Sequence, residues 1–238
     1  MLGNINAQNV LFLDIETVPA APSYEDAGPE VKALWEKKSV HIQKENETVA
    51  DTYERAGIYA EFGKVVCVSA GFIFNREGEK WFRVKSFVGD DERQILSDLS
   101  AMLTNRYKRD MLLCAHNGKE FDFPYLARRM LINGITLPPV LDVAGKKPWE
   151  VPFLDTLELW KFGDYKHYTS LELLSFLFRL PSPKADLEGS MVAGVYWREH
   201  DLERISRYCE GDAFTVAQLF LRFQGQPLID PSRVETIR

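Results

Sequence analysis

Short β-branched runs and longer stretches with helical spacing alternate along the chain. Dense or alternating apolar residues predict strands at 9–15, 64–74, 80–88 and 110–117, and a strand that continues into a helix at 152–160. Apolar residues three and four apart predict helices at 90–106, 123–135, 170–180 and 201–225. Three strands therefore precede the part of the chain in which strands and helices alternate. This order predicts an α/β fold with a mixed sheet, in which an antiparallel meander is extended by parallel strands and flanked by helices.

Two segments lie outside this pattern. Residues 19–60 are polar and charge-rich, and the stretch PEVKALWEKK within them begins with proline and shows helical spacing. We interpret them as a partly helical insertion after the first strand. The tail 225–238 is expected to run over the surface as a C-terminal extension. The pattern as a whole predicts a single domain over residues 1–238.

The first predicted strand contains two carboxylates. In LFLDIETVP (11–19), Asp14 and Glu16 stand two residues apart among apolar residues, so their side chains point to the same face of the strand. Burying unpaired charge is costly. The pair therefore either faces water from an edge strand or faces a positively charged partner.

Two later segments carry further acidic residues. HNGKEFDFPYLARR (116–129) leaves a buried strand through a turn at Asn117 and enters a helix at Asp122. Taken alone, Asp122 is most simply a helix N-cap, although ligands in open α/β sheets favour such strand ends. In the last long helix, Tyr208 and Asp212 stand four residues apart and share a face. Taken alone, that pair is equally typical of a solvated helix surface.

Together the three segments supply four carboxylates and a phenol, in the patterns D-x-E, N-x-x-x-F-D and Y-x-x-x-D. Converging carboxylates repel one another unless cations lie between them. Oxygen-rich sites of this kind suit Mg²⁺ or Mn²⁺. Two such ions about 3.5–4 Å apart stabilise both the attacking and the leaving oxygen of a phosphoryl transfer. We therefore expect the four carboxylates to face two divalent cations.

These segments resemble the three exonuclease motifs of the DEDD superfamily, whose fold is ribonuclease H-like. The tyrosine four residues before the last aspartate resembles the tyrosine subclass, since the histidine subclass has histidine where this chain has Arg207. NGKEFDFPYLARR (117–129) resembles the second exonuclease motif of family-B DNA polymerases. Over residues 9–224 the chain is similar to stand-alone bacterial 3′–5′ exonucleases related to the proofreading domain of those polymerases.

The resemblance implies a role for each matching residue. Asp14, Glu16, Asp122 and Asp212 would bind two Mg²⁺ or Mn²⁺ ions, and Tyr208 would hold the attacking water. Because tyrosine has a reference pKa of about 10, it is better suited to orienting a water than to deprotonating it. The implied substrate is the 3′ end of single-stranded DNA, which would be hydrolysed to nucleoside 5′-monophosphates.

Contacts with that 3′ end are implied for three more residues. Thr17 would offer its backbone amide or hydroxyl to the terminal nucleotide, Asn117 would contact the substrate nearby, and Phe121 would pack against the terminal base or sugar.

Three other functions stay open. An exoribonuclease would share the chemistry, because discrimination against RNA rests on contacts to one 2′-hydroxyl. A ribonuclease H-like module without activity would bind nucleic acid as a scaffold, which the complete set of four carboxylates disfavours. A phosphatase of the D-x-D type would need aspartate where the chain has Glu16, and it leaves Tyr208 without a role.

Composition limits the kinds of partner and the cellular compartment that we expect for the protein. The net charge of −6 argues against a dedicated non-specific nucleic-acid binder but not against an enzyme that binds nucleic acid at one local site. No apolar stretch approaches the roughly 18 residues needed to span a membrane, and the N-terminus shows no signal-peptide pattern. The three cysteines (Cys67, Cys114 and Cys209) are expected as buried free thiols in a reducing compartment, which predicts a cytoplasmic protein. Nothing in the sequence indicates a protein partner.

Other polar residues near these motifs receive simpler interpretations. Asp155 in FLDTLELW is expected to cap a strand end together with Thr156, or else to support the site. Basic clusters of this kind more often lie on a solvated face than along a phosphate chain, and among them Arg128 and Arg129 are the best candidates for a substrate phosphate, because their helix begins at the site. Trp35 is expected to pack in the insertion.

Overall fold

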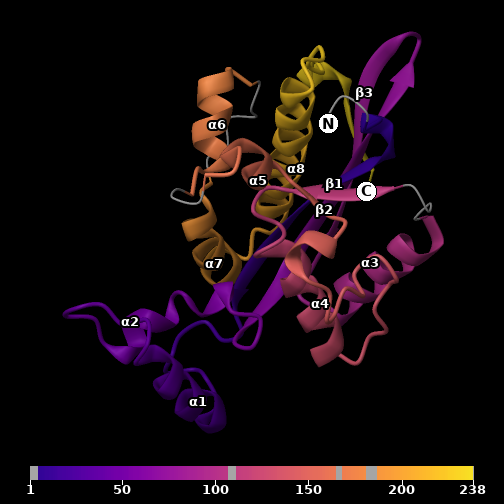
Figure 1. Ribbon diagram of the computed structural model, residues 1–238. Helices are drawn as coiled ribbons and strands as arrows, with labels where there is room; N and C mark the ends of the chain where they lie inside the picture. Colours follow the sequence, from indigo (N-terminus) through magenta and orange to yellow (C-terminus); the bar gives the residue numbers. More distant parts are fainter. Residues whose placement is uncertain (1–4, 107–110, 165–167, 181–186, 238) are drawn as a thin grey trace.

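The computed structural model describes residues 5–106, 111–164, 168–180 and 187–237, and it is built around one sheet (Figure 1). Within these residues the sheet has six strands in the order β5-β4-β1-β2-β3-β6. The strands are β1 (Val10–Pro19), β2 (Gly63–Arg76), β3 (Glu79–Val88), β4 (Leu112–Ala115), β5 (Leu154–Asp155) and β6 (Val234–Ile237). The first three pair antiparallel, and β4, β5 and β6 pair parallel to their neighbours. The predicted mixed α/β fold is confirmed and is consistent with a ribonuclease H-like architecture.

Helices cover both faces of the sheet. The described α-helices are α1 (Pro29–Ser39), α2 (Val49–Tyr53), α3 (Glu92–Arg106), α4 (Asp122–Ile132), α5 (Thr156–Lys161), α6 (Leu171–Phe178), α7 (Val192–Gly194) and α8 (Leu202–Phe223). One core lies under α3 and α4, and another lies under α8. In Figure 1, α3 and α4 lie on one side of the sheet and α6 and α8 on the other.

The alternation of β1 divides its side chains between the two cores. Leu11, Leu13 and Ile15 belong to the core under α3 and α4, whereas Val10 and Phe12 belong to the core under α8. Even-numbered positions of β1 therefore point toward α8, as the two-residue period of a strand requires. This face also carries Asp14 and Glu16.

The insertion has a small aromatic core of its own. Trp35 is fully buried and packs edge-on against Tyr53, with ring centroids 5.5 Å apart, and its indole N–H donates to the Thr52 hydroxyl at 3.1 Å. Figure 1 shows α1 and α2 projecting from one end of the molecule. The predicted partly helical character of residues 19–60 and the packing role of Trp35 are confirmed.

The hairpin between β2 and β3 turns at Glu77 and Gly78. Both residues have positive φ, 53° and 82°, the combination found in the tight turns that match the twist of paired strands.

Two expectations about the C-terminal third need correction. The tail is not only a surface extension, because Val234–Ile237 pair parallel with β3, and Glu235 binds Arg83 at 2.8 Å. Residues 189–199, for which no element was predicted, form a 3₁₀ turn (Gly189–Met191), α7 and a π-helical turn (Val195–Glu199). Among the described helices, none is both long enough and apolar enough to cross a bilayer.

Candidate active site

Asp14 and Glu16 lie on β1 between two apolar contacts with α8. On one side, Phe12 packs edge-on against Phe220, with ring centroids 5.6 Å apart. On the other side, Val18 belongs to a buried cluster with Ile205 and Cys209 of α8. These flanking contacts fix the separation of strand and helix on either side of the two carboxylates.

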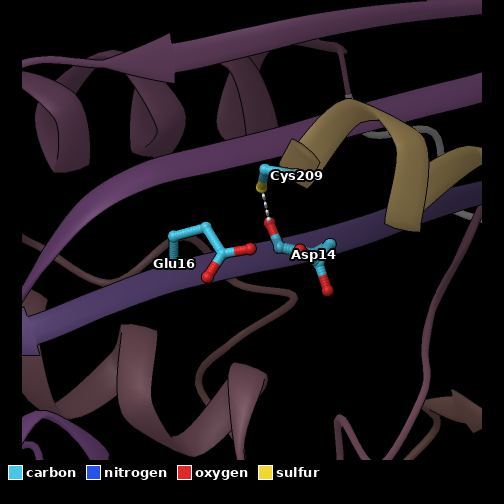
Figure 2. A group of neighbouring side chains, drawn as sticks. All are labelled: Asp14, Glu16 and Cys209. Atoms are coloured by element: carbon cyan, nitrogen blue, oxygen red, sulfur yellow. Dashed lines mark hydrogen bonds between the residues drawn. The ribbon is translucent and has the colours of Figure 1, made fainter. Parts of the chain in front are cut away.

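Cys209 of α8 completes a group of three possible ligands (Figure 2). Its thiol donates to the backbone carbonyl oxygen of Asp14, with Sγ and O 3.3 Å apart, and one ligand atom from each of Asp14, Glu16 and Cys209 lies within 4.8 Å of the others. Sequence reasoning did not include Cys209 in the site. Its position three residues before Asp212, on the same face of the helix, is the signal that could have indicated it.

A β-bulge follows the two carboxylates. The register between β1 and β2 shifts between Glu16, which pairs with Cys67, and Thr17, which pairs with Val65. Bulges often occur beside functional sites because they re-aim the side chains that follow. Thr17 is half-buried, and its hydroxyl hydrogen-bonds to that of Tyr125 in α4.

Asp122 joins the group from the opposite helical layer. It is the first residue of α4 and only 4% exposed, and the N-cap position belongs to Phe121. Its carboxylate accepts a hydrogen bond from the backbone N–H of Ile15. The carboxylate therefore reaches β1 just past Phe12, the last residue paired with β4. The simple interpretation of Asp122 as the N-cap is wrong.

The turn that leads to Asp122 is fixed by close packing and by Asp155. Asn117 adopts a positive φ of 62°, and a Cβ on Gly118 would lie 2.4 Å from the Cβ of Ala115, so the turn requires glycine there. The Asp155 carboxylate accepts from the backbone N–H groups of Asn117 at 2.9 Å and Lys119 at 3.0 Å.

Asp155 also caps α5, where it accepts from Leu157 N–H at 2.9 Å. The predicted capping role is thus confirmed, and the same side chain also supports the turn before α4. Next to it, the ring of His116 bridges the Thr156 hydroxyl at 2.9 Å and the Thr169 carbonyl at 2.8 Å.

Electrostatics set the carboxylates apart from ordinary surface acids. Burial, followed by the charge of neighbouring carboxylates, raises the pKa of Asp14 and Glu16 well above their usual values. Burial raises the pKa of Asp122 to about 7 and that of Asp212 to about 6. The four groups therefore repel one another strongly when they are all ionised.

The Tyr208 hydroxyl donates a hydrogen bond to Asp212, which lowers the pKa of that carboxyl against the larger effect of burial. Burial and the nearby carboxylates raise the pKa of Tyr208 well above its usual range. The phenol therefore stays protonated and can act only as a hydrogen-bond donor or acceptor near neutral pH.

The site opens on a cleft of about 1150 Å³. Asp14, Tyr208 and Asp212 line it, together with residues of α6 and the segment 187–190. The described residues that line the cleft do not include Glu16, Asp122, Thr17, Asn117 or Phe121. Phe121 instead packs against Tyr125, with ring centroids 5.4 Å apart.

Arg129 is not available to a substrate phosphate. It is largely buried and binds both oxygens of Glu92, with N–O distances of 2.8 and 2.5 Å, and it also donates to the Ala60 carbonyl at 2.9 Å. The expectation for this residue is wrong, because its charge is already compensated within the core. Arg128, its neighbour, is exposed.

A comparison with protein families gives one match over most of the chain. Residues 58–227 match a family model described as a predicted 3′–5′ exonuclease related to the exonuclease domain of PolB. The matched residues include Asn117, Asp122, Tyr208 and Asp212, but Asp14, Glu16 and Thr17 precede them. The structure supplies what the match does not cover, because it brings β1 and its two carboxylates against the matched helices. The resemblance inferred from the motifs is confirmed at the level of this family.

Proposed function

The chain belongs to the family of predicted 3′–5′ exonucleases related to the PolB exonuclease domain, and we propose that it hydrolyses single-stranded DNA from the 3′ end to nucleoside 5′-monophosphates. The observation that carries this proposal is the convergence of four carboxylates and a tyrosine, from three separate elements, beside one cleft. No role in stability accounts for placing so many acids together.

Divalent cations fit the residues of the site. The donor atoms are mainly carboxylate oxygens, which suit Mg²⁺ or Mn²⁺. Oδ2 of Asp14 is buried and has no hydrogen-bond partner among the described residues, and a cation would satisfy it. We propose that Asp14, Glu16, Asp122 and Asp212 hold two ions. When bound, these ions would supply Lewis-acid stabilisation of the negative charge that develops on the reacting oxygens.

The protein's own groups would then position the reactants. Tyr208 lines the cleft beside Asp212, and its protonated hydroxyl would orient the attacking water. Asn117 and Phe121 lie on the turn that leads to Asp122, and Thr17 follows Glu16 directly. We retain these three as proposed contacts for the 3′-terminal nucleotide. RNA stays the alternative substrate, and a nucleic-acid scaffold stays the non-catalytic alternative.

The proposal is tested with 5′-labelled single-stranded DNA and RNA of the same sequence. With Mg²⁺ or Mn²⁺, the wild-type protein should shorten the DNA one nucleotide at a time, and excess chelator should stop the reaction. Asp14→Asn serves as the matched inactive control, because it removes one charge without changing the shape of the side chain. Faster shortening of the RNA would identify an exoribonuclease. Binding of either strand without cleavage would identify a scaffold, and cleavage in excess chelator would exclude the metal site.

A further inference from the structure

One wall of the cleft is a helix that exposes large apolar side chains to it. On α6, Phe176 is 77% exposed and Leu177 is 55% exposed, and both line the cleft that contains Asp14 and Asp212. Tyr168, just before α6 in sequence, is 67% exposed and lines the same cleft. Exposed apolar side chains gathered in a groove commonly mark a surface that binds a ligand.

The exposure of this wall does not come from a poorly packed helix. Leu174 of α6 is fully buried in a cluster with Leu219 of α8. At the end of α6, Phe178 packs edge-on against Trp160 and Phe223, with ring centroids 5.7 and 5.9 Å apart. α6 is therefore anchored by one side, and Phe176 is presented to the cleft by the other.

Charge on the described lining residues does not favour a ligand held by its phosphates alone. Arg179 is the one lysine or arginine among them, whereas the acids are Asp14, Asp212, Glu172 and Glu188. The described part of this wall therefore offers a chain of phosphates little attraction by charge. Stacking of bases on aromatic rings is an attraction of another kind, and it does not depend on base identity.

The size of the cleft agrees with a chain rather than a single small molecule. Pockets for drug-sized ligands span roughly 300–1,000 Å³, and this cleft, at about 1150 Å³, exceeds that range. It also runs from the carboxylates to the exposed rings without leaving one cavity. A strand whose terminal phosphodiester lies at the carboxylates can therefore extend along α6.

We propose that the wall formed by Phe176, Leu177 and Tyr168 binds the unpaired bases that precede the 3′-terminal nucleotide, with Phe176 stacking on one of them and Arg179 contacting a phosphate. This inference rests on the proposed nuclease function and names the part of the protein that selects single strands. Paired bases in a duplex are stacked on their neighbours and have no free face for the ring.

Single-turnover cleavage of labelled single-stranded DNA with Mg²⁺ tests the proposal. Phe176→Ala should raise the half-saturating protein concentration by roughly 5- to 150-fold, the range for one stacked base, and should leave the rate at saturation nearly unchanged. Phe176→Trp should retain tight binding, whereas Phe176→Leu, which keeps an apolar side chain without a ring, should not. Leu173→Ala is the matched control, because Leu173 is 47% exposed on the same helix but is not among the lining residues. Equal half-saturation for wild type and Phe176→Ala, or full rescue by leucine, would overturn the stacking role.

Two further measurements separate the contacts. Substrates with abasic residues at the second to fourth positions from the 3′ end should weaken binding to wild type but not further weaken binding to Phe176→Ala. Arg179→Gln should reduce the salt dependence of binding by about 0.7 in the log–log slope, the value for one phosphate contact on a single strand. Phe176→Ala should leave that slope unchanged. An abasic effect that is equally large in both proteins would place the bases elsewhere.

Failure of this inference is distinguishable from failure of the proposed function. A wild-type protein that leaves every labelled strand intact with Mg²⁺ and with Mn²⁺ would refute the nuclease itself. The alternative is that a second copy of the chain covers this wall. Sedimentation velocity at the assay concentration tests this, because it shows whether the protein is a monomer or a dimer. A wild-type dimer that Phe176→Ala converts to monomers would overturn the stacking proposal, and a monomer in both cases supports it.

Discussion

Replacing Asp155 should separate the support of the site from its chemistry. This buried carboxylate accepts three short hydrogen bonds from backbone N–H groups. Its Oδ1 atom accepts from Asn117 and Leu157 at 2.9 Å, and its Oδ2 atom accepts from Lys119 at 3.0 Å. A fourth donor, Glu158 N–H, lies farther from Oδ1, at 3.4 Å. One side chain therefore joins the turn before α4 to the start of α5.

The free energy of these bonds can be worked out from their number. A hydrogen bond to a charged group stabilises a protein by about 1.5–3 kcal/mol, and desolvation of the carboxylate offsets part of the sum. Asp155→Ala leaves three donors without this acceptor, one of them buried and two partly buried, and should therefore lower the free energy of unfolding by about 3–5 kcal/mol. Asp155→Asn can keep the bonds to Oδ1 and lose only the one from Lys119, so it should cost about 1–2 kcal/mol.

Urea unfolding in metal-free buffer measures both changes. Asp201→Ala is the matched control, because Asp201 caps α8 through one bond, to Arg204 N–H at 2.9 Å, and loss of a cap alone costs about 1 kcal/mol. Single-turnover cleavage should fall in Asp155→Ala and stay close to wild type in Asp155→Asn, because the asparagine still holds the turn that leads to Asp122. If Asp155→Ala is destabilised no more than Asp201→Ala, the turn is held by other contacts and this reasoning is wrong.

Three further predictions concern the carboxylates and the tyrosine. Asp14→Asn and Asp212→Asn should each abolish turnover while raising the melting temperature in metal-free buffer, because each removes charge from a repelling cluster; a lower melting temperature would show that the carboxylate is structural. Tyr208→Phe should slow single-turnover cleavage by roughly 10²–10⁴-fold at saturating Mn²⁺. The control is Tyr196→Phe, which removes a hydroxyl that accepts from Lys64 at 2.6 Å, and it should cleave at the wild-type rate. Equal rates for the two variants would make Tyr208 a packing residue. Because the pKa of Asp122 is raised to about 7 and that of Asp212 to about 6, their protonated forms stabilise the metal-free protein at low pH, and this stability is lost as pH rises through those values. Mg²⁺ binding must displace these protons, so Mg²⁺ should raise the melting temperature more at pH 8 than at pH 5, and a larger increase at pH 5 would contradict the assignment.

The parts of the site carried by a local period could be predicted from the sequence. The two-residue period of a strand places Asp14 and Glu16 on one face, and the helical period places Tyr208 beside Asp212. Neither period shows that the first pair faces the second. That contact depends on β1 lying under α8, which is set by packing between distant parts of the chain, such as Phe12 on Phe220.

Where the sequence failed, the missing information was a distant partner. Arg129 looks like a free cation until the fold brings it to Glu92, 37 residues earlier. The strand at Val234–Ile237 is too short to show a pattern of its own, and it forms because the edge of β3 is open to it. Asp122 resembles an N-cap because the sequence cannot reveal that its carboxylate accepts from the backbone N–H of Ile15 in β1.

The arrangement of β1 explains how a fold can retain a group of repelling acids. Apolar positions on both sides of Asp14 and Glu16 pack against α8, and on the opposite face of the strand Leu13 is fully buried and Ile15 nearly so. The position of the strand is therefore determined without the carboxylates, and their repulsion is a local cost that does not displace it. A cation that enters the site removes this cost in a protein already folded around it. For this reason, metal binding here is expected to change the stability and charge of the site rather than its architecture.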